Sequence, residues 1–126
     1  MAHVLLVEPN KVLARTYIRA LEHGGHTVGH ATGAQEAVDV ADDHQPAVVV
    51  LELQLGARDG IEFLHEFRSY PEWQGVPVIL HTQVTPVALA QFQRVLASDL
   101  GVVASLYKPQ TSLVKLISTV NIQVAT

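Results

Sequence analysis

The chain has 126 residues, 48% of them hydrophobic and 16% charged, which is typical of one globular domain with a substantial core. Its net charge of −4, with only eight Lys and Arg residues scattered along the sequence, argues against a nucleic-acid partner. Cysteine is absent, which excludes disulfides and zinc–thiolate sites, and no apolar run approaches the ~20 residues of a membrane helix, so we expect a cytoplasmic protein with no membrane partner.

Five short apolar runs along the chain have the length and composition of buried strands. Val48–Leu51 is apolar at every position, which predicts a central strand that is covered on both faces. Pro77 lies near the start of another run, where its missing N–H does least harm to a sheet. The expected strands are Val4–Val7, Thr27–Ala31, Val48–Leu51, Val76–Leu80 and Ala104–Tyr107.

Segments of helical periodicity fill the intervals between these runs, and most of them begin at a residue whose side chain can cap a helix. We expect the first helix to end at Gly24-Gly25, the fourth at about Ser98, and the chain to fray from about Asn121. The helices are expected to start at Asn10, at the capping-box spacings Thr32–Gln35 and Asp59–Glu62, and at Thr85-Pro86, and a last helix contains Leu113–Val120.

Strands that alternate with helices through short connections predict a doubly wound α/β fold, in which helices cover both faces of a five-stranded parallel sheet. In such sheets the functional site lies outside the carboxyl ends of the strands. At the expected strand ends the sequence places two carboxylates, a hydroxyl and an ammonium, which are Glu8, Glu52, Thr82 and Lys108. These four side chains are our candidate site.

Five segments at these positions share a resemblance to one known family. They are Leu5–Glu8, Gly33–Ala37, Leu53–Gly60, Pro77–Thr82 and Tyr107–Pro109. In this order and spacing they resemble response regulator receiver domains of bacterial two-component systems, from roughly His3 to Val120. The resemblance implies a flavodoxin-like fold with strand order 2-1-3-4-5, a single receiver-like domain over residues 1–126, a signalling role rather than an enzyme, and a cis peptide bond before Pro109.

The resemblance also implies which positions carry the phosphoryl chemistry, and three of them are altered. Glu52 is the phosphoacceptor equivalent, where the family has Asp, and Pro9 replaces one of two adjacent acids that hold Mg²⁺. Ser105 stands at the aromatic switch position, while the hydroxyl switch residue is kept as Thr82. Without the metal, a transferring phosphoryl group loses its main electrostatic stabiliser. We therefore expect a degenerate acidic pocket that is formed by Glu8, Pro9, Glu52, Thr82 and Lys108. This pocket is expected to hold no catalytic residue, cofactor or metal. If weak Mg²⁺ binding survives, it would use Glu8 and Glu52.

The two retained polar residues, Lys108 and Thr82, could also have purely structural roles. The ammonium of Lys108 can neutralise Glu52 or Glu8, with a gross attraction of roughly 4 kcal/mol at ~4 Å and an effective dielectric constant of about 20. Desolvation of the charges offsets much of this attraction. Thr82 can bond nearby backbone at the end of its strand. A retained lysine and threonine therefore do not by themselves indicate phosphotransfer.

Glu52 has two competing explanations. Its longer side chain either imitates the phosphorylated state or is a by-product of lost catalysis in a domain kept as a binding scaffold. We favour the scaffold, because Ser105 removes part of the usual readout of the signal. Tyr107 lies two residues farther along the same expected strand and should face the same side, so a rewired switch remains open.

The function we expect is a receiver-like signalling domain that is not phosphorylated and acts by contact with a protein partner: a histidine kinase, an output domain or another regulator. By analogy the contact face, which could also form a homodimer, comprises the fourth helix, fifth strand and fifth helix. Two alternatives remain: a working receiver with a relaxed Mg²⁺ requirement, and a flavodoxin-like enzyme or nucleotide binder, although the loop at Glu8–Asn10 has no glycines to cradle phosphate. Polar residues of the contact face are Gln91, Arg94, Asp99 and Lys115.

Three histidines invite a functional reading. His26 and His30 share one side of an expected strand and could imitate a metal pair, but no third ligand is evident, so ordinary strand or surface roles are expected. His81 precedes Thr82 on an apolar strand and could either titrate near neutral pH or serve as a hydrogen-bonded core residue, which we favour.

Overall fold

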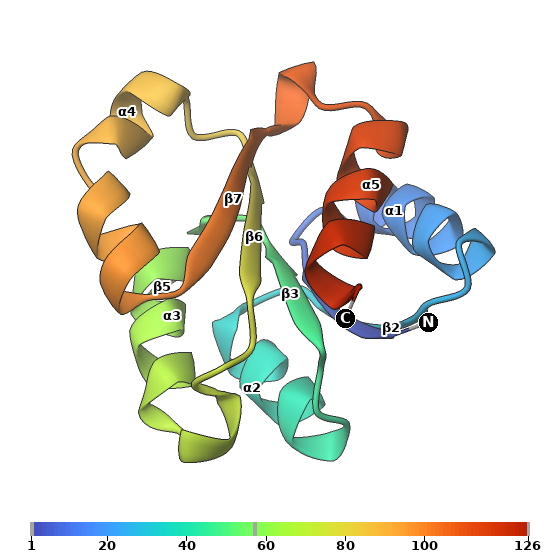
Figure 1. Ribbon diagram of the computed structural model, residues 1–126, viewed down its shortest axis with the longest axis horizontal. Coiled ribbons are helices and arrows are strands. Elements are labelled where there is room, and N and C mark those ends of the chain that lie inside the picture. The colour runs from blue at the N-terminus through green and yellow to red at the C-terminus, as the bar shows by residue number, and fades with distance from the viewer. Residues whose placement is uncertain (1, 57, 126) are drawn as a thin grey trace.

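The computed structural model describes residues 2–56 and 58–125 as a parallel sheet flanked by helices (Figure 1). The strand order is β2-β1-β3-β6-β7, and β4 and β5 form a short antiparallel hairpin apart from this sheet. With the hairpin left aside, the order is the predicted 2-1-3-4-5. The strands are β1 His3–Val7, β2 Thr27–Ala31, β3 Val48–Leu51, β4 Gln54–Leu55, β5 Arg58–Asp59, β6 Val78–Thr82 and β7 Val102–Tyr107.

Helices cover both faces of the sheet because each strand is followed by a crossover to the next parallel strand (Figure 1). The helices are α1 Lys11–His23, α2 Ala34–Asp43, α3 Gly60–Ser69, α4 Pro86–Ala90 and α5 Leu113–Val124. None of the helices in the described part of the chain combines the length and apolarity that a membrane crossing requires.

Two buried clusters, one on each face, hold the three layers together. On one face of the sheet, Leu5 of β1 and Leu51 of β3 pack against α2, α3 and the segment after β6. Phe63 and Phe67 of α3 are completely buried in this cluster. The other face packs Leu6 against α1 and α5. This alternation is why the central strands are apolar at every position.

Capping residues set the helix starts as the sequence predicts. The Asn10 Oδ1 accepts hydrogen bonds from the backbone N–H groups of Val12 and Leu13, both at 3.0 Å. Asp59 and Thr85 cap α3 and α4 in the same way. At Gly60 the backbone passes so close to Leu53 that a Cβ would lie 2.8 Å from the Leu53 Cα, so glycine fits this position.

Several predicted boundaries are wrong. The sheet pairing shifts the fourth strand from the predicted Val76–Leu80 to Val78–Thr82, and the fifth strand begins at Val102 rather than at Ala104. The end of α5 does not fray at Asn121, because the Asn121 side chain bonds the buried ring of His26 at 2.7 Å and the helix continues. The peptide bond before Pro109 is trans, and Lys108–Gln110 forms a 3₁₀ turn.

Two helix starts and ends also differ from the prediction. At α2 the partner of Thr32 is Glu36, not Gln35: the backbone N–H of Thr32 donates to the Glu36 carboxylate at 2.6 Å, and Gly33 is the cap. The predicted fourth helix is interrupted, since α4 ends at Ala90 and a π-helical turn follows at Val95–Asp99. Few side chains of this segment are buried, so packing does little to enforce a regular helix.

Candidate functional site

The carboxyl ends of four neighbouring strands bring the four candidate side chains into contact. Glu8 follows β1, Glu52 follows β3, Thr82 is the last residue of β6, and Lys108 follows β7. Because the strands are parallel and adjacent in the order β1-β3-β6-β7, their ends meet at one edge of the sheet. All but Lys108, whose side chain is 8% exposed, are less than 5% exposed. The site is therefore a buried polar pocket.

Lys108 lies at the centre of the pocket and bridges the two acids. Its Nζ donates to Oε1 of Glu8 at 2.7 Å and to Oε1 of Glu52 at 2.8 Å. These partners lie 100 and 56 residues away along the chain. One ammonium therefore closes the pocket by pairing two buried carboxylates at once.

Glu52 receives hydrogen bonds on both of its carboxylate oxygens. Oε1 accepts from Lys108 and from the backbone N–H of Gln83, the latter at 3.1 Å. Oε2 accepts from the Thr82 hydroxyl and from the backbone N–H of Gln54 at 3.1 Å. The Thr82 hydroxyl in turn accepts from the N–H of Val84 at 3.1 Å. Glu52 thus tethers the loop between β6 and α4 as well as its own loop.

One carboxylate oxygen of Glu8 accepts a hydrogen bond from Lys108, and the other accepts one from the backbone at the start of α1. Its Oε2 accepts from the backbone N–H of Asn10 at 3.0 Å, and Pro9 between them contributes no side-chain oxygen. From its sequence Asn10 was predicted only to cap a helix, and the amides of Gln54 and Gln83 were not predicted, since backbone groups have no signature in a sequence.

The pKa shifts agree with a permanently charged pair. Burial alone raises the pKa of the Glu52 carboxyl, but hydrogen bonds from Lys108, Thr82 and the Gln54 amide outweigh burial and hold this pKa below its ordinary value. Burial alone lowers the pKa of the Lys108 ammonium, but its bonds to Glu52 and Glu8 raise this pKa above its ordinary value. At neutral pH the pocket therefore holds Glu52 ionised and Lys108 protonated.

Ser105 lies apart from these four side chains. In the sheet register it pairs with Leu80, two residues below the level at which Thr82 pairs with Tyr107. Ser105 and Tyr107 line one cavity of about 90 Å³ next to α4, together with Val84. Both residues therefore face the same side of β7, as their spacing predicts.

The three histidines have structural partners. The ring of His26 bonds Asn121 and the backbone N–H of Ala2, and the ring of His30 bonds the carbonyl of Glu8 at 2.9 Å. His81 is buried edge-on against Tyr17 with ring centroids 4.9 Å apart. Burial, and then the charge of Lys108, lower the pKa of His81 to about 4, so it is neutral at physiological pH and does not titrate near neutrality.

A family comparison agrees with this fold. A model of the response regulator receiver domain matches residues 4–121. The chain belongs to the response regulator receiver domain family. It is therefore a receiver domain of the kind found in two-component signalling.

Relatives support the assignment, and a solved structure shares the fold. The chain is 33% identical over 109 residues to the KDP operon transcriptional regulatory protein KdpE of Escherichia coli, covering 86% of this chain and 45% of KdpE. It is 31% identical over 107 residues to the transcriptional regulatory protein PdtaR of Mycobacterium tuberculosis, covering 84% and 49%. This receiver domain thus spans about half the length of these relatives. Chemotaxis protein CheY4 of Vibrio cholerae shares the fold, with a TM-score of 0.85, 22% identity, and coverage of 98% of this chain and 99% of CheY4.

Proposed function

We propose that this receiver domain is not phosphorylated at position 52 and acts in two-component signalling by binding other proteins. The observation that carries the proposal is the hydrogen bonding of Glu52, whose two carboxylate oxygens are occupied by Lys108, Thr82 and two backbone amides. A carboxylate that must attack a phosphoryl group needs a free oxygen at the mouth of its pocket. Both carboxylate oxygens of Glu52 are instead bonded to groups inside the pocket.

The donor set of the pocket does not fit Mg²⁺, and the proposed function needs no cofactor. Mg²⁺ takes near-octahedral oxygen ligands, and proteins usually hold it with carboxylates and water. Here the Nζ of Lys108 lies within 2.8 Å of both Glu8 and Glu52, so an ammonium stands between the two carboxylates. Pro9 offers no further side-chain oxygen. Weak Mg²⁺ binding through Glu8 and Glu52 would require Lys108 to withdraw.

Glu52 is best explained as part of a fixed scaffold. Its bonds to the Thr82 hydroxyl and the Gln83 amide hold the loop before α4 in one arrangement without any added group. The same contacts are those that an imitation of a phosphorylated state would make, so the two explanations share one geometry. Ser105, exposed and outside the pocket, supports the scaffold over a switch.

The proposed contact face comprises α4, β7 and α5. It exposes large apolar side chains, including Val87 at 85% and Val103 at 47% exposure. A kinase, an output domain, another regulator or a second copy of the chain would bind here, beside the polar residues Gln91, Arg94, Asp99 and Lys115.

Incubation with acetyl phosphate and Mg²⁺, followed by intact mass measurement, tests the proposal. We expect no phosphoryl adduct on the wild-type chain or on Pro9→Asp, and an adduct on the double variant Glu52→Asp with Pro9→Asp. Circular dichroism confirms that each variant is folded. A stable adduct on the wild-type chain would reject the proposal in favour of a working receiver with a relaxed Mg²⁺ requirement, which titration with Mg²⁺ would then show.

A further inference from the structure

A cavity apart from the strand-end pocket lies between the loop that follows β3 and the segment that follows β6. Its volume is about 560 Å³, and its lining comes from the β4–β5 hairpin, the start of α3 and the segment around α4. In Figure 1 these elements lie on the side of the sheet away from α1 and α5. We call this site the hairpin cavity.

The inner lining of the hairpin cavity is apolar and almost fully buried. Leu53 and Leu89 are each 5% exposed, and Leu55 is 8% exposed. The rim is exposed and more polar, and it includes Gln54 and Asp59. An apolar interior with a few polar groups at its mouth is the usual form of a small-molecule site.

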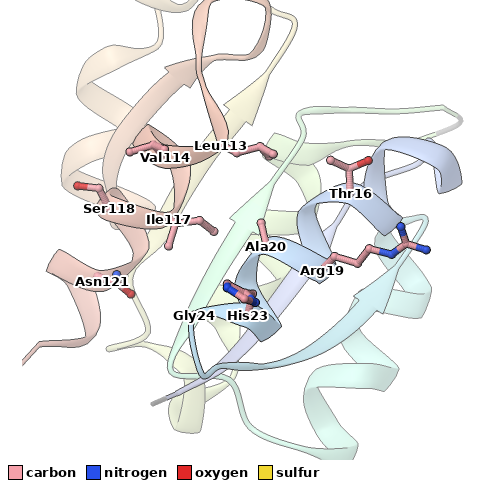
Figure 2. Close-up of a pocket in the computed structure, with 10 residues that line it drawn as sticks. All are labelled: Thr16, Arg19, Ala20, His23, Gly24, Leu113, Val114, Ile117, Ser118 and Asn121. Atoms are coloured by element: carbon pink, nitrogen blue, oxygen red, sulfur yellow. The ribbon is translucent and has the colours of Figure 1, made fainter.

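The groove between α1 and α5 has a different form (Figure 2). Its volume is about 750 Å³, but its apolar side chains are open to water: Val114 is 80% exposed and Leu113 is 41% exposed. Figure 2 shows both on α5, with Arg19 and His23 on the α1 side. This α1–α5 groove is therefore an open surface, whereas buried side chains enclose the hairpin cavity.

Hydrogen bonds fix both walls of the hairpin cavity. On one wall β4 and β5 pair with each other, and the N–H of Gly60 donates to the carbonyl of Leu53 at 2.7 Å. On the other wall the Thr85 side chain caps α4 by accepting from the N–H of Ala88 at 3.2 Å. Because the cavity is already formed, a ligand that enters it orders little further structure on binding.

The rim offers a negative charge and an aromatic face. Among the side chains that the structure describes, Asp59 is the one charged residue of the lining, and it forms no ion pair with another of them. Its Oδ1 accepts from the N–H of Glu62 at 2.8 Å, which holds the carboxylate at the start of α3. Phe92 also lines the cavity and is 42% exposed. A carboxylate and an exposed aromatic ring complement a cation that is attached to an apolar group.

We propose that the hairpin cavity binds a small organic amine, whose apolar ring fills the inner lining and whose ammonium group pairs with the carboxylate of Asp59. Pockets that bind drug-sized molecules typically measure about 300–1,000 Å³, a range that includes this cavity. The inference does not depend on whether position 52 accepts a phosphoryl group.

The bound amine would contact both loops that Glu52 joins. Leu53 directly follows Glu52, and the N–H of Gln54 donates to the Glu52 carboxylate at 3.1 Å. On the other loop, the N–H of Val84 donates to the Thr82 hydroxyl at 3.1 Å. All three of Leu53, Gln54 and Val84 line the cavity. The amine would therefore stabilise the present arrangement of these loops without a phosphoryl group.

Other classes of ligand use this site less completely. An organic anion would meet the Asp59 carboxylate, and among the described residues the lining has no Lys or Arg to pair with it. A metal ion alone would find too few ligands, since the described residues include no group of three or more His, Cys, Asp or Glu placed to bind one. A purely apolar molecule would cover Asp59 without pairing its charge.

The test uses the full chain, labelled with ¹⁵N, and tryptamine as the probe. Two matched molecules serve as controls: indole, which has the ring without the ammonium, and indole-3-acetate, which has a carboxylate instead. We expect tryptamine to bind at least about tenfold more tightly than indole-3-acetate, with indole between them. Saturable chemical-shift changes should centre on the lining, including the amides of Gln54, Ile61, Val84 and Phe92.

Substitutions at the rim separate the charge from the apolar contact. Asp59→Asn keeps a residue that caps helices well but removes the charge, so tryptamine should bind about fivefold or more weakly while indole is unaffected. The control Asp42→Asn removes an exposed acid of α2 outside the cavity and should change neither affinity. Circular dichroism confirms that each variant is folded.

A second pair of variants tests the aromatic ring. Phe92→Ala should weaken tryptamine and indole alike, because both lose contact with the ring. Val87→Ala, at an exposed position of α4 that does not line the cavity, should leave both affinities unchanged. Both side chains are exposed, so neither substitution threatens the fold.

Three outcomes would overturn the inference. They are no saturable change at the lining with tryptamine, changes centred on the α1–α5 groove instead, and a preference for tryptamine over indole-3-acetate that is absent or that survives Asp59→Asn. None of these readouts involves phosphorylation, so the inference and the proposed function can fail separately.

Discussion

The strand-end pocket and the α1–α5 groove treat charge in opposite ways. In the pocket, Lys108 and its two carboxylate partners are almost fully buried and bonded to one another. On α1, Arg15 and Arg19 are exposed and form no ion pair within the described part of the chain, and Arg19 lines the groove between α1 and α5. The pocket contains the residue types of a reactive site, but its charged groups are already bonded to one another. The groove has exposed apolar side chains and a basic edge whose arginine forms no ion pair within the described part of the chain.

Under the proposed function, polar residues at the expected place do not by themselves make a reactive site. Buried charges need partners, and in the pocket both carboxylates are paired with Lys108. Charges on an open surface cost little to leave unpaired and remain available to a partner. The following predictions test this contrast, from the largest expected effect to the smallest.

Removal of the central ammonium should give the largest effect. Lys108→Met leaves Glu8 and Glu52 buried without their cation, so we expect the free energy of unfolding to fall by about 3–5 kcal/mol. Urea denaturation measures this loss, and Lys115→Met, at an exposed lysine, should change stability by no more than about 0.5 kcal/mol. A loss below about 1 kcal/mol would mean that water already screens the pocket.

Acid should destabilise the domain through His81. Its folded pKa of about 4 lies below the ordinary value of 6.5, so the folded state favours the neutral ring. The stability that this provides is complete above the unfolded pKa and is lost as the pH falls from about 6.5 toward about 4. We expect a loss of about 1–2 kcal/mol between about pH 7 and about pH 5, measured by urea denaturation at each pH.

The variant His81→Leu should reduce this pH dependence, whatever its effect on stability at neutral pH. His65→Gln, at an exposed histidine of α3, serves as the control and should keep the wild-type slope. An unchanged slope in His81→Leu would show that other groups account for the sensitivity to acid.

Asn10 connects the two regions, since its amide bonds Glu8 and its side chain caps α1. Asn10→Ala removes the cap but keeps the backbone bond, so we expect a loss of about 1 kcal/mol in unfolding free energy. The contacts of Lys108 should persist, so the pH dependence of the unfolding free energy should match that of the wild-type chain. A loss as large as that of Lys108→Met would mean that the pocket itself opens when the cap is removed.

The smallest effect on stability is expected at the groove. Arg15→Glu with Arg19→Glu changes four units of charge on an exposed helix face, yet the free energy of unfolding should stay within roughly 0.5 kcal/mol of wild type. Thermal denaturation checks this expectation. A large loss would assign these arginines to folding and would remove the contrast between groove and pocket.

Much of the fold and of the strand-end site was predictable because the responsible signals are local. Val48–Leu51 is apolar at every position and is a central strand, and Asn10 caps a helix through atoms two and three residues away. Glu8, Glu52, Thr82 and Lys108 could be predicted to meet once a parallel sheet was expected. The predictions failed where distant contacts decide: α5 continues past Asn121 because of His26.

The sequence by itself determined the alternation of strands and helices, the family, and the presence of proline rather than an acid at position 9. Only the tertiary structure decided that Lys108 binds both carboxylates and that Arg19 lines a groove between the first and last helices. The physical reason is the distance along the chain over which each kind of interaction acts. Periodicity and caps act over a few residues, whereas these contacts depend on strand order and on which helices share a face of the sheet.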